Sequence, residues 1–223
     1  SENVTLGPNV EISPNAVIDV GVKIGHSVRI GSGVYIGSNT EIGHNTNISP
    51  NVTIYHDIKI GNNCLIDSGT IIGSDGFGII STHSKHYRIP HIGSVIIGND
   101  VLIGSNCSID RGSIGDTCLE DQVKLDNQVH LAHNVCIGQA SVIAANTTVA
   151  GSTSIGKNCT ISGGCGIIDN LEIADSVHIT ALSLVTKSID NPGTYTSGTT
   201  LMEHNLWKKN AVLFKRLKDI IKK

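Results

Sequence analysis

Branched apolar residues recur at every sixth position along most of this chain of 223 residues. Twelve of them, which we call anchors, follow one another in a single phase with mostly polar residues between: Leu6, Ile12, Ile18, Ile24, Ile30, Ile36, Ile42, Ile48, Ile54, Ile60, Ile66 and Ile72. A fixed period of this kind is the signature of a repeat architecture in which each unit buries its apolar side against its neighbours. The repeat therefore predicts a solenoid.

Each hexad is long enough for one short strand and one corner. Glycine often follows the anchor directly, as in Ile24-Gly25 and Ile30-Gly31, and it can adopt the backbone angles of a sharp bend. Three hexads close one triangular coil, so anchors 18 residues apart stack at the spacing of hydrogen-bonded strands, about 4.8 Å. The expected fold is all-β, a parallel β-helix prism.

The hexad phase breaks twice. After Ile72 it resumes at Ile97, and the residues between include Phe77 and Tyr87, although aromatic residues make up only 3% of the chain. A second slip adds four residues between Ile109 and Leu119, after which the phase holds to Val185. The 27 anchors predict about nine coils in a domain spanning 1–187, with an insertion loop at 73–96. A long insertion on a regular solenoid usually lies on the functional face.

The pattern changes towards the C-terminus. An irregular connector is expected at 188–202, with a turn at Pro192-Gly193. From 203 to 223 a helical spacing of four and three predicts a helix with an a/d seam formed by Leu206, Asn210, Leu213, Leu217 and Ile220. Such a seam favours association with other copies of the chain, and the alternative is a helix folded back on the prism. The remaining face of this helix is basic and carries Lys208, Lys209, Lys215, Arg216, Lys218 and Lys222.

The charge distribution, the hydropathy and the cysteines indicate the partner and the cellular compartment of the protein. Residues 1–202 carry 9 basic and 17 acidic side chains, whereas 203–223 carry 7 basic and 2 acidic ones, which indicates an acidic partner for the tail. The chain has no run of 18 apolar residues and opens on a polar stretch, so we expect a cytoplasmic protein without an integral membrane segment. We expect free thiols packed in the core at the fifth hexad position, namely Cys64, Cys107, Cys159 and Cys165.

Three segments carry a resemblance that is closer than the repeat itself: NVTIYHDIKIGNNCLIDSGTIIGSDGFG, IPHIGSVIIGNDVLIGSNCSIDRGSIGDT and LDNQVHLAHNVCIG. They resemble the UDP-3-O-(3-hydroxyacyl)glucosamine N-acyltransferases of lipid A biosynthesis, and the similarity extends to VAGSTSIG and NPGTYTSGTTL. The resemblance implies left-handed coiling, although the general rule for parallel crossovers favours the right hand.

The resemblance also implies what the protein does. Members of that family are cytoplasmic homotrimers that move an (R)-3-hydroxyacyl group from acyl carrier protein to the 2-amino group of the nucleotide sugar. No cofactor is expected besides the 4'-phosphopantetheine that the carrier protein brings, and no nucleic acid partner is expected. This chain departs from the family in two ways: the hexads begin at once, without the N-terminal domain that helps to bind uridine, and Asn170 stands where a second histidine is usual.

His133 is the expected catalytic base. Acyl transfer to an amine needs a base for the amine proton and hydrogen-bond donors for the oxyanion. One coil of 18 residues leads from His133 to Gly151, whose N–H no side chain obstructs, and a second coil leads to Asp169. By resemblance the N–H of Gly151 is the oxyanion donor. The alternative for His133 is a solvated corner histidine, since His26 and His44 occupy comparable hexad positions.

Polar residues near His133 are candidates for substrate binding. Asp126 and Asn127 lie on the preceding turn, Asn134 adjoins the base, and Asn170 has an amide that can donate a hydrogen bond. We expect these residues to bind the acceptor or to orient the imidazole. The structural alternative is that Asn and Asp simply tolerate tight corners.

Basic residues are candidates for binding the carrier protein. By resemblance Lys187 lies where phosphopantetheine enters, although a lone lysine at the end of a coil is usually just solvated. Lys208, Lys209 and Lys215 on the basic helix provide a surface for an acidic carrier.

Three other functions compete with this interpretation. His83, His86 and His91 lie in the insertion, and trimeric β-helix carbonic anhydrases bind zinc with histidines shared between subunits, but the spacing is a weak signal and the loop offers no evident supporting groups, so we expect no metal. An acetyl-CoA-dependent hexapeptide acetyltransferase is the second enzyme class. The third alternative is a catalytically weak scaffold or paralogue.

Overall fold

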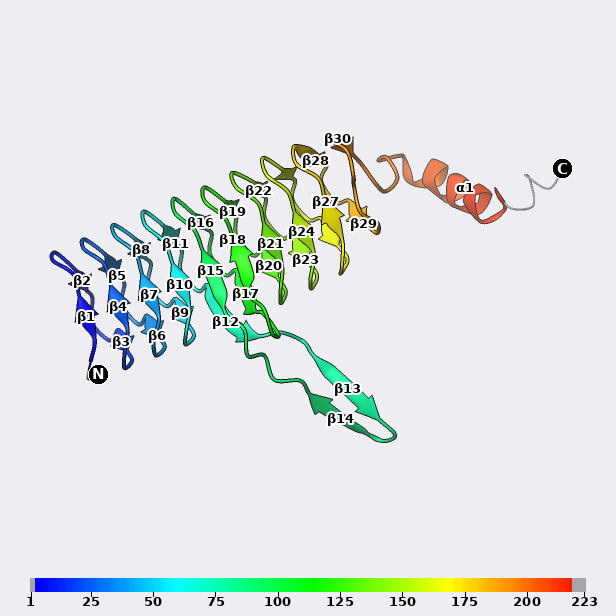
Figure 1. Cartoon of the computed structure of the whole chain (residues 1–223). Coiled ribbons are helices and arrows are strands. Elements are labelled where there is room, and N and C mark those ends of the chain that lie inside the picture. Colours follow the sequence, from blue (N-terminus) through cyan, green and yellow to red (C-terminus); the bar gives the residue numbers. More distant parts are fainter. Residues whose placement is uncertain (1–2, 218–223) are drawn as a thin grey trace.

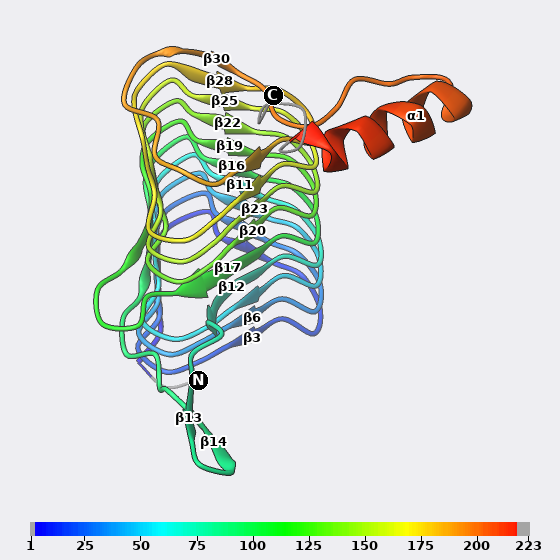
Figure 2. The same cartoon turned by 90° about the vertical axis from the view of Figure 1, so that its right-hand side faces the viewer.

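A computed structural model of the chain describes residues 3–217, which form a long prism of short strands with a helix beyond one end (Figure 1). Three parallel sheets of nine, ten and nine strands make the three sides of the prism. Strands in register lie one coil apart, so that Leu6 pairs with Ile24 and Leu131 pairs with Val149. Seen along the prism, successive coils lie over one another (Figure 2).

The strands follow the three sides in rotation. The first sheet contains β1 (Thr5–Leu6), β4 (Lys23–Ile24), β7 (Glu41–Ile42), β10 (Lys59–Ile60), β15 (Val95–Ile97), β18 (Thr117–Leu119), β21 (Cys136–Ile137), β24 (Ser154–Ile155) and β27 (Glu172–Ile173). The second contains β2 (Glu11–Ile12), β5 (Arg29–Ile30), β8 (Asn47–Ile48), β11 (Leu65–Ile66), β16 (Leu102–Ile103), β19 (Lys124–Leu125), β22 (Val142–Ile143), β25 (Thr160–Ile161), β28 (Val177–Ile179) and β30 (Gly193–Tyr195). The third contains β3 (Val17–Ile18), β6 (Tyr35–Ile36), β9 (Thr53–Ile54), β12 (Ile71–Asp75), β17 (Ser108–Arg111), β20 (His130–Leu131), β23 (Thr148–Val149), β26 (Gly166–Ile167) and β29 (Leu184–Val185).

The anchors form the core, as predicted. From Ile24 to Val185 they point into the prism and are buried, because each is covered by the anchors of the coils on either side. The first coil is covered on one side only, so Leu6 and Ile12 are 48% and 43% exposed. The predicted cysteine positions are also confirmed, since Cys64, Cys107, Cys159 and Cys165 are buried and free.

The corners depart from the prediction in one respect. Apart from Gly73 at the bulge of β12, the glycines directly after the anchors do not adopt positive φ; instead, the third residue after the anchor does, and it is often an asparagine, as at Asn45 and Asn134. Glycine follows the anchor because the coils stack closely there. A Cβ at Gly25 would lie 2.8 Å from the backbone nitrogen of His44 on the next coil. These glycines therefore permit close stacking and do not make the bend.

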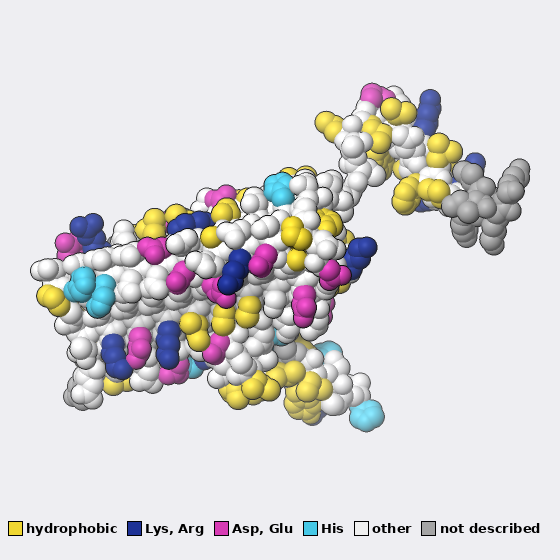
Figure 3. Space-filling view, turned by 45° about the horizontal axis from the view of Figure 1, so that its top comes forward, with side chains coloured by type: hydrophobic (Ala, Val, Ile, Leu, Met, Phe, Trp, Pro, Cys, Tyr) yellow, Lys and Arg dark blue, Asp and Glu magenta, His cyan; other side chains and the backbone are white. Residues whose placement is uncertain are grey.

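The insertion at 73–96 is more ordered than a loop. Strand β12 runs to Asp75 with a bulge at Gly73, and β13 (Ile79–Thr82) pairs with β14 (Lys85–Arg88) in an antiparallel hairpin that projects from the prism (Figures 1 and 2). Hydrophobic side chains gather on this hairpin and on the C-terminal helix (Figure 3). The chain rejoins the prism at β15, one residue before the expected end of the insertion.

The C-terminal region adds one strand that the sequence did not predict. Within the expected connector, Ile189 bridges to Ile173 and β30 pairs with β28, because an edge strand of the last coil still offers free backbone groups. Helix α1 (His204–Lys215) begins after Glu203, whose carboxylate accepts hydrogen bonds from the N–H groups of Asn205 and Leu206. None of its residues is buried, so it does not fold back on the prism. Lys218, Ile220 and Lys222 lie outside the described residues.

Candidate active site

One corner of the prism collects half of the predicted site residues. His133 lies two residues after β20, Gly151 two after β23, Asp169 two after β26 and Lys187 two after β29, all following strands of the third sheet. The N–H of Ser152 donates to the His133 carbonyl over 3.0 Å, and the N–H of Asn170 donates to the Gly151 carbonyl over 3.0 Å. The expected stacking of these corners is therefore present, and we call this row the corner column.

The proton on the His133 ring is assigned by a chain of hydrogen bonds. Asn134 Oδ1 accepts from the backbone N–H of Ser113 over 3.0 Å, which identifies that side-chain atom as the oxygen. The same oxygen lies 3.0 Å from His133 Nδ1, and an oxygen in an amide can only accept, so Nδ1 carries the proton. In the neutral imidazole, His133 Nε2 then keeps its lone pair. The half-buried ring has the tautomer that a general base requires.

Gly151 lies directly against the basic nitrogen. A Cβ built on it would be 2.8 Å from both Cε1 and Nε2 of His133, closer than side chains approach. Among the contacts of the described residues, its N–H has no hydrogen-bond acceptor, whereas the N–H of Lys157 at another corner is taken by Asp175 Oδ1 at 2.7 Å. A reacting atom beside His133 would therefore meet a free backbone donor.

Asp126 and Asn127 lie at a different corner. They follow β19 of the second sheet, where Asp126 accepts from the N–H groups of Asn127 and Ala145, and Asn127 Oδ1 accepts from the N–H of Ser105. Neither side chain has a hydrogen bond to His133 in the described part of the chain. The imidazole is oriented by Asn134 and not by these two residues, because a whole strand separates the two corners.

Asn170 and Lys187 lie on the outer part of the corner column. Asn170 Nδ2 donates to Asp169 Oδ2 over 2.7 Å, so one amide proton is engaged and the exposed side chain keeps the other. The Lys187 side chain is exposed, three coils from His133 along the column.

Sequence reasoning missed two groups beside His133. His91 is only 6% exposed and packs edge-on to His133, with ring centroids 5.3 Å apart and planes at 65°. Asp110 is 8% exposed, accepts from Ser74 Oγ over 2.9 Å and lies 3.8 Å from His130 Nε2. Burial raises the pKa of Asp110, although the hydrogen bond from Ser74 opposes the rise. The only signals for these residues in the sequence were the histidines of the insertion and the break in phase after Ile109.

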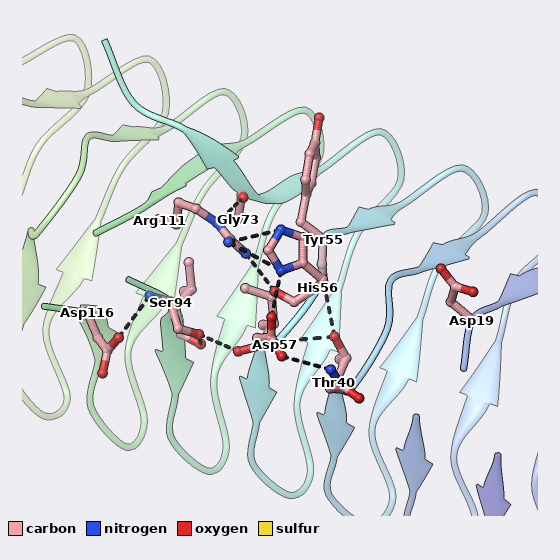
Figure 4. Close-up of polar contacts among 12 residues, drawn as sticks. Asp19, Thr40, Tyr55, His56, Asp57, Gly73, Ser94, Arg111 and Asp116 are labelled. Atoms are coloured by element: carbon pink, nitrogen blue, oxygen red, sulfur yellow. Dashed lines mark hydrogen bonds and ion pairs between the residues drawn. The ribbon is translucent and has the colours of Figure 1, made fainter. Parts of the chain in front are cut away.

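A buried guanidinium connects the start of the insertion to the prism. Arg111 is 3% exposed, and its guanidinium donates to the carbonyls of Gly73 and His56 over 2.8 and 2.6 Å and contacts the His56 ring at 3.1 Å (Figure 4). His56 Nδ1 in turn lies 2.7 Å from Asp57 Oδ2, and this hydrogen bond lowers the pKa of Asp57. Arg111 thus ties the bulge of β12 to an earlier coil of the same corner column.

Two grooves open on either side of this region. The first, about 510 Å³, lies under the hairpin and is lined by Asp75, Gly76, Phe77, Gly78, Ile79, His86, Tyr87, Arg88, Asp110 and His130. The second, about 420 Å³, is lined by His56, Asp57, His91, Ile92, Gly93, Ser94, Arg111, Ile114 and Asp116. Both are bordered by the insertion, so the insertion shapes the surroundings of His133.

The insertion histidines do not converge on a metal site. His83 and His86 are exposed on the hairpin while His91 is buried against the prism, and no group of three metal-ligating side chains occurs within residues 3–217. Also within that range, no helix is long and apolar enough to cross a membrane.

Repeat families match the N-terminal half of the prism. The family described as bacterial transferase hexapeptide (six repeats) matches residues 9–44 and 39–74, and the hexapeptide repeat of succinyl-transferase matches residues 94–119. These segments coincide with the hexads on either side of the insertion.

Curated relatives point to one enzyme. The chain is 44% identical over 156 residues to UDP-3-O-acylglucosamine N-acyltransferase of Chromohalobacter salexigens, covering 70% of this chain and 45% of the relative. It is 49% identical over 153 residues to the same enzyme of Acinetobacter baylyi (69% and 43%), and 52% identical over 149 residues to that of Xanthomonas oryzae pv. oryzae (67% and 44%). The chain thus spans less than half the length of these relatives.

Solved structures share the fold. UDP-N-acetylglucosamine O-acyltransferase from Moraxella catarrhalis matches with a TM-score of 0.71 and 26% identity, covering 92% of this chain and 77% of that one. The corresponding enzyme from Bacteroides fragilis matches with a TM-score of 0.68 and 27% identity (86% and 71%). The predicted left-handed parallel β-helix with a C-terminal helix is confirmed by the sheets together with this likeness.

Proposed function

We propose that this chain, which matches hexapeptide-repeat transferase families over parts of its length and UDP-3-O-acylglucosamine N-acyltransferases over about 70% of it, is an N-acyltransferase of lipid A biosynthesis. The proposed reaction moves a 3-hydroxyacyl group from acyl carrier protein to the 2-amino group of UDP-3-O-(3-hydroxyacyl)glucosamine in the cytoplasm. The observation that carries the proposal is the His133 ring, whose Nδ1 lies against Asn134 Oδ1 and whose Cε1–Nε2 edge lies against Gly151, a residue with no acceptor for its N–H among the described residues.

The chemistry divides between these two groups. The acceptor amine attacks the thioester carbonyl carbon, and His133 Nε2 takes the proton that the amine loses. The carbonyl oxygen gains the negative charge and accepts a hydrogen bond from the N–H of Gly151. When the tetrahedral intermediate collapses, the carbon–sulfur bond breaks and the imidazolium returns its proton to the leaving thiolate. The hydrogen bond from Nδ1 to Asn134 keeps the ring in the required tautomer throughout.

The acceptor site is proposed to involve more than one copy of the chain. Asn134 and Asn170 lie in the corner column with His133, but Asp126 and Asn127 lie one side of the prism away. A contact from Asp126 or Asn127 to a sugar held at His133 therefore needs a second copy whose corner faces the first. This requirement supports a homotrimer with active sites between subunits.

The donor is proposed to approach along the outer part of the corner column. Lys187 lies on the exposed coil at that end, and α1 carries Lys208, Lys209 and Lys215 with exposed side chains beyond it. Acyl carrier proteins are acidic, so these cations would attract the carrier and guide its phosphopantetheine towards His133.

The proposal is tested by assaying transfer from 3-hydroxyacyl carrier protein and from acetyl-CoA to the aminosugar. We expect turnover with the carrier protein only, and we expect His133→Ala to lower kcat by about 10² to 10⁴ because a general base is removed. His44→Ala, at a comparable hexad position in an earlier coil, is the matched control and should leave kcat unchanged. Full activity in His133→Ala would place the base elsewhere, and turnover with acetyl-CoA alone would favour an acetyltransferase.

A further inference from the structure

His91 marks the point where the insertion returns to the prism, and its ring lies against the proposed base. A Cβ built on Gly76, at the outgoing end of the insertion, would be 2.9 Å from His91 Nε2 and 3.0 Å from Cβ and Cδ2 of His133. The two ends of the insertion, at Gly76 and His91, therefore both lie against the Cβ–Cδ2 edge of the His133 ring. The Cε1–Nε2 edge faces Gly151.

Hydrogen bonding does not explain why a histidine occupies this place. His91 Nδ1 lies 3.1 Å from the Ile89 carbonyl, which can only accept, so Nδ1 carries the proton and Nε2 is an acceptor. His91 Nε2 is buried and is the one buried side-chain nitrogen or oxygen atom within residues 3–217 that has no hydrogen-bond partner. An unpaired buried acceptor destabilises a fold. What the ring supplies is its shape beside His133.

We propose that His91 is a positioning residue for acyl transfer: its ring holds the His133 imidazole against Gly151. The inference rests on the proposed role of His133 as the base. Asn134 fixes the Nδ1 side of the ring with one hydrogen bond, and a single hydrogen bond still permits the imidazole to swing. The edge-on contact with His91 fills the space into which the ring would swing. The insertion therefore supports the catalytic base in addition to shaping the two grooves.

Kinetics separate this role from a merely structural one. His91→Ala should lower kcat about 10- to 100-fold, because misplacing a catalytic group by about 1 Å has an effect of that size. KM for the aminosugar should stay within about twofold, since ground-state binding is not removed. His91→Phe keeps an aromatic edge and removes the unpaired acceptor, so it should restore kcat to within about threefold of wild type. Equal losses in the Ala and Phe variants would overturn the proposal.

A double-mutant cycle tests whether His91 acts through His133. In a His133→Ala background, His91→Ala should cause no further loss of kcat, because the group that it positions is absent. An equal loss in both backgrounds would show that His91 acts on something else.

A measurement without substrate separates this inference from the proposed function. In imidazole NMR spectra of the full chain, His91→Ala should shift and broaden the His133 Hε1 signal, because a neighbouring ring is lost and the imidazole gains freedom. His91→Phe should keep one sharp His133 signal. An unchanged His133 signal in His91→Ala overturns the inference whatever the activity. If the wild type transfers nothing but these NMR changes occur, the positioning contact stands and only the proposed reaction fails.

Discussion

The tautomer of His133 is decided by a backbone group that the ring does not touch. The N–H of Ser113 fixes the orientation of the Asn134 amide, and that amide fixes the proton on Nδ1. Ser113 belongs to the four-residue slip between Ile109 and Leu119, which is an irregularity in the hexad sequence. The slip that interrupts the repeat thus orients the ring of His133, which the repeat itself places on the corner.

Gly151→Ala should impair acyl transfer without unfolding the prism. The added methyl group would lie 2.8 Å from His133 Cε1 and Nε2 and must displace the ring. At Gly25 the nearest atoms include backbone of the next coil, whereas at Gly151 they belong to a side chain, which can move. We expect kcat to fall about 10²-fold, as for a misplaced catalytic group, with an unchanged thermal unfolding midpoint.

Gly166→Ala is the matched control for this change. Gly166 lies on β26 of the same sheet, and a Cβ there would meet Leu184 Cδ1 at an ordinary 3.4 Å. It should retain wild-type kcat. If Gly151→Ala is as active as Gly166→Ala, the close approach of Gly151 to His133 is not needed for the reaction.

At the scale of elements, the six-residue period predicted the strands and their stacking. It did not predict the structure of the segments that depart from this period. The anchors lie 18 residues apart in register, so the row of His133, Gly151 and Asp169 followed from counting. His91 did not, because nothing in the spacing says which way a 73–96 insertion turns. Strand β30 was missed because its register depends on the path of the connector and not on an apolar period.

Helix α1 gives a prediction about the donor. Changing Lys208, Lys209 and Lys215 together to Glu should raise KM for 3-hydroxyacyl carrier protein about tenfold at low salt and leave KM for the aminosugar unchanged, since long-range attraction between charged surfaces is lost. The effect should shrink in 0.5 M NaCl, where the Debye length is only a few ångströms.

The control for this charge change makes the same kind of substitution at two lysines on the prism. Lys23→Glu and Lys59→Glu alter two exposed cations on β4 and β10, far from the helix along the prism (Figure 1). They should leave KM for the carrier protein near wild type. Equal effects of both sets would indicate a response to net charge and not a docking surface on α1.

At the scale of the whole molecule, the single chain has a complete core and an incomplete surface. On the outer side of the third sheet, the paired residues Val17 and Tyr35 are exposed at one end, and Leu184 is 58% exposed at the other end. These exposed apolar side chains are available for contact with a second chain. The sequence predicted the burial of the anchors because burial follows the period of six. The sequence did not predict which outward-facing apolar residues contact a partner, because the six-residue period carries no information about how two prisms pack together.

We expect the protein to be a trimer, and helix α1 offers the sharpest test. Its apolar side chains Leu206 and Leu213 are 51% and 54% exposed, as expected of a seam that lacks its partner helices. Analytical ultracentrifugation at micromolar concentration should give about three times the 23.4 kDa of one chain. Leu206→Glu with Leu213→Glu should lower that mass, because carboxylates would then face one another in the seam. Leu201→Glu, at a fully exposed residue outside the helix, should not. A wild-type chain that sediments as a monomer would contradict both the trimer and the acceptor site shared between subunits.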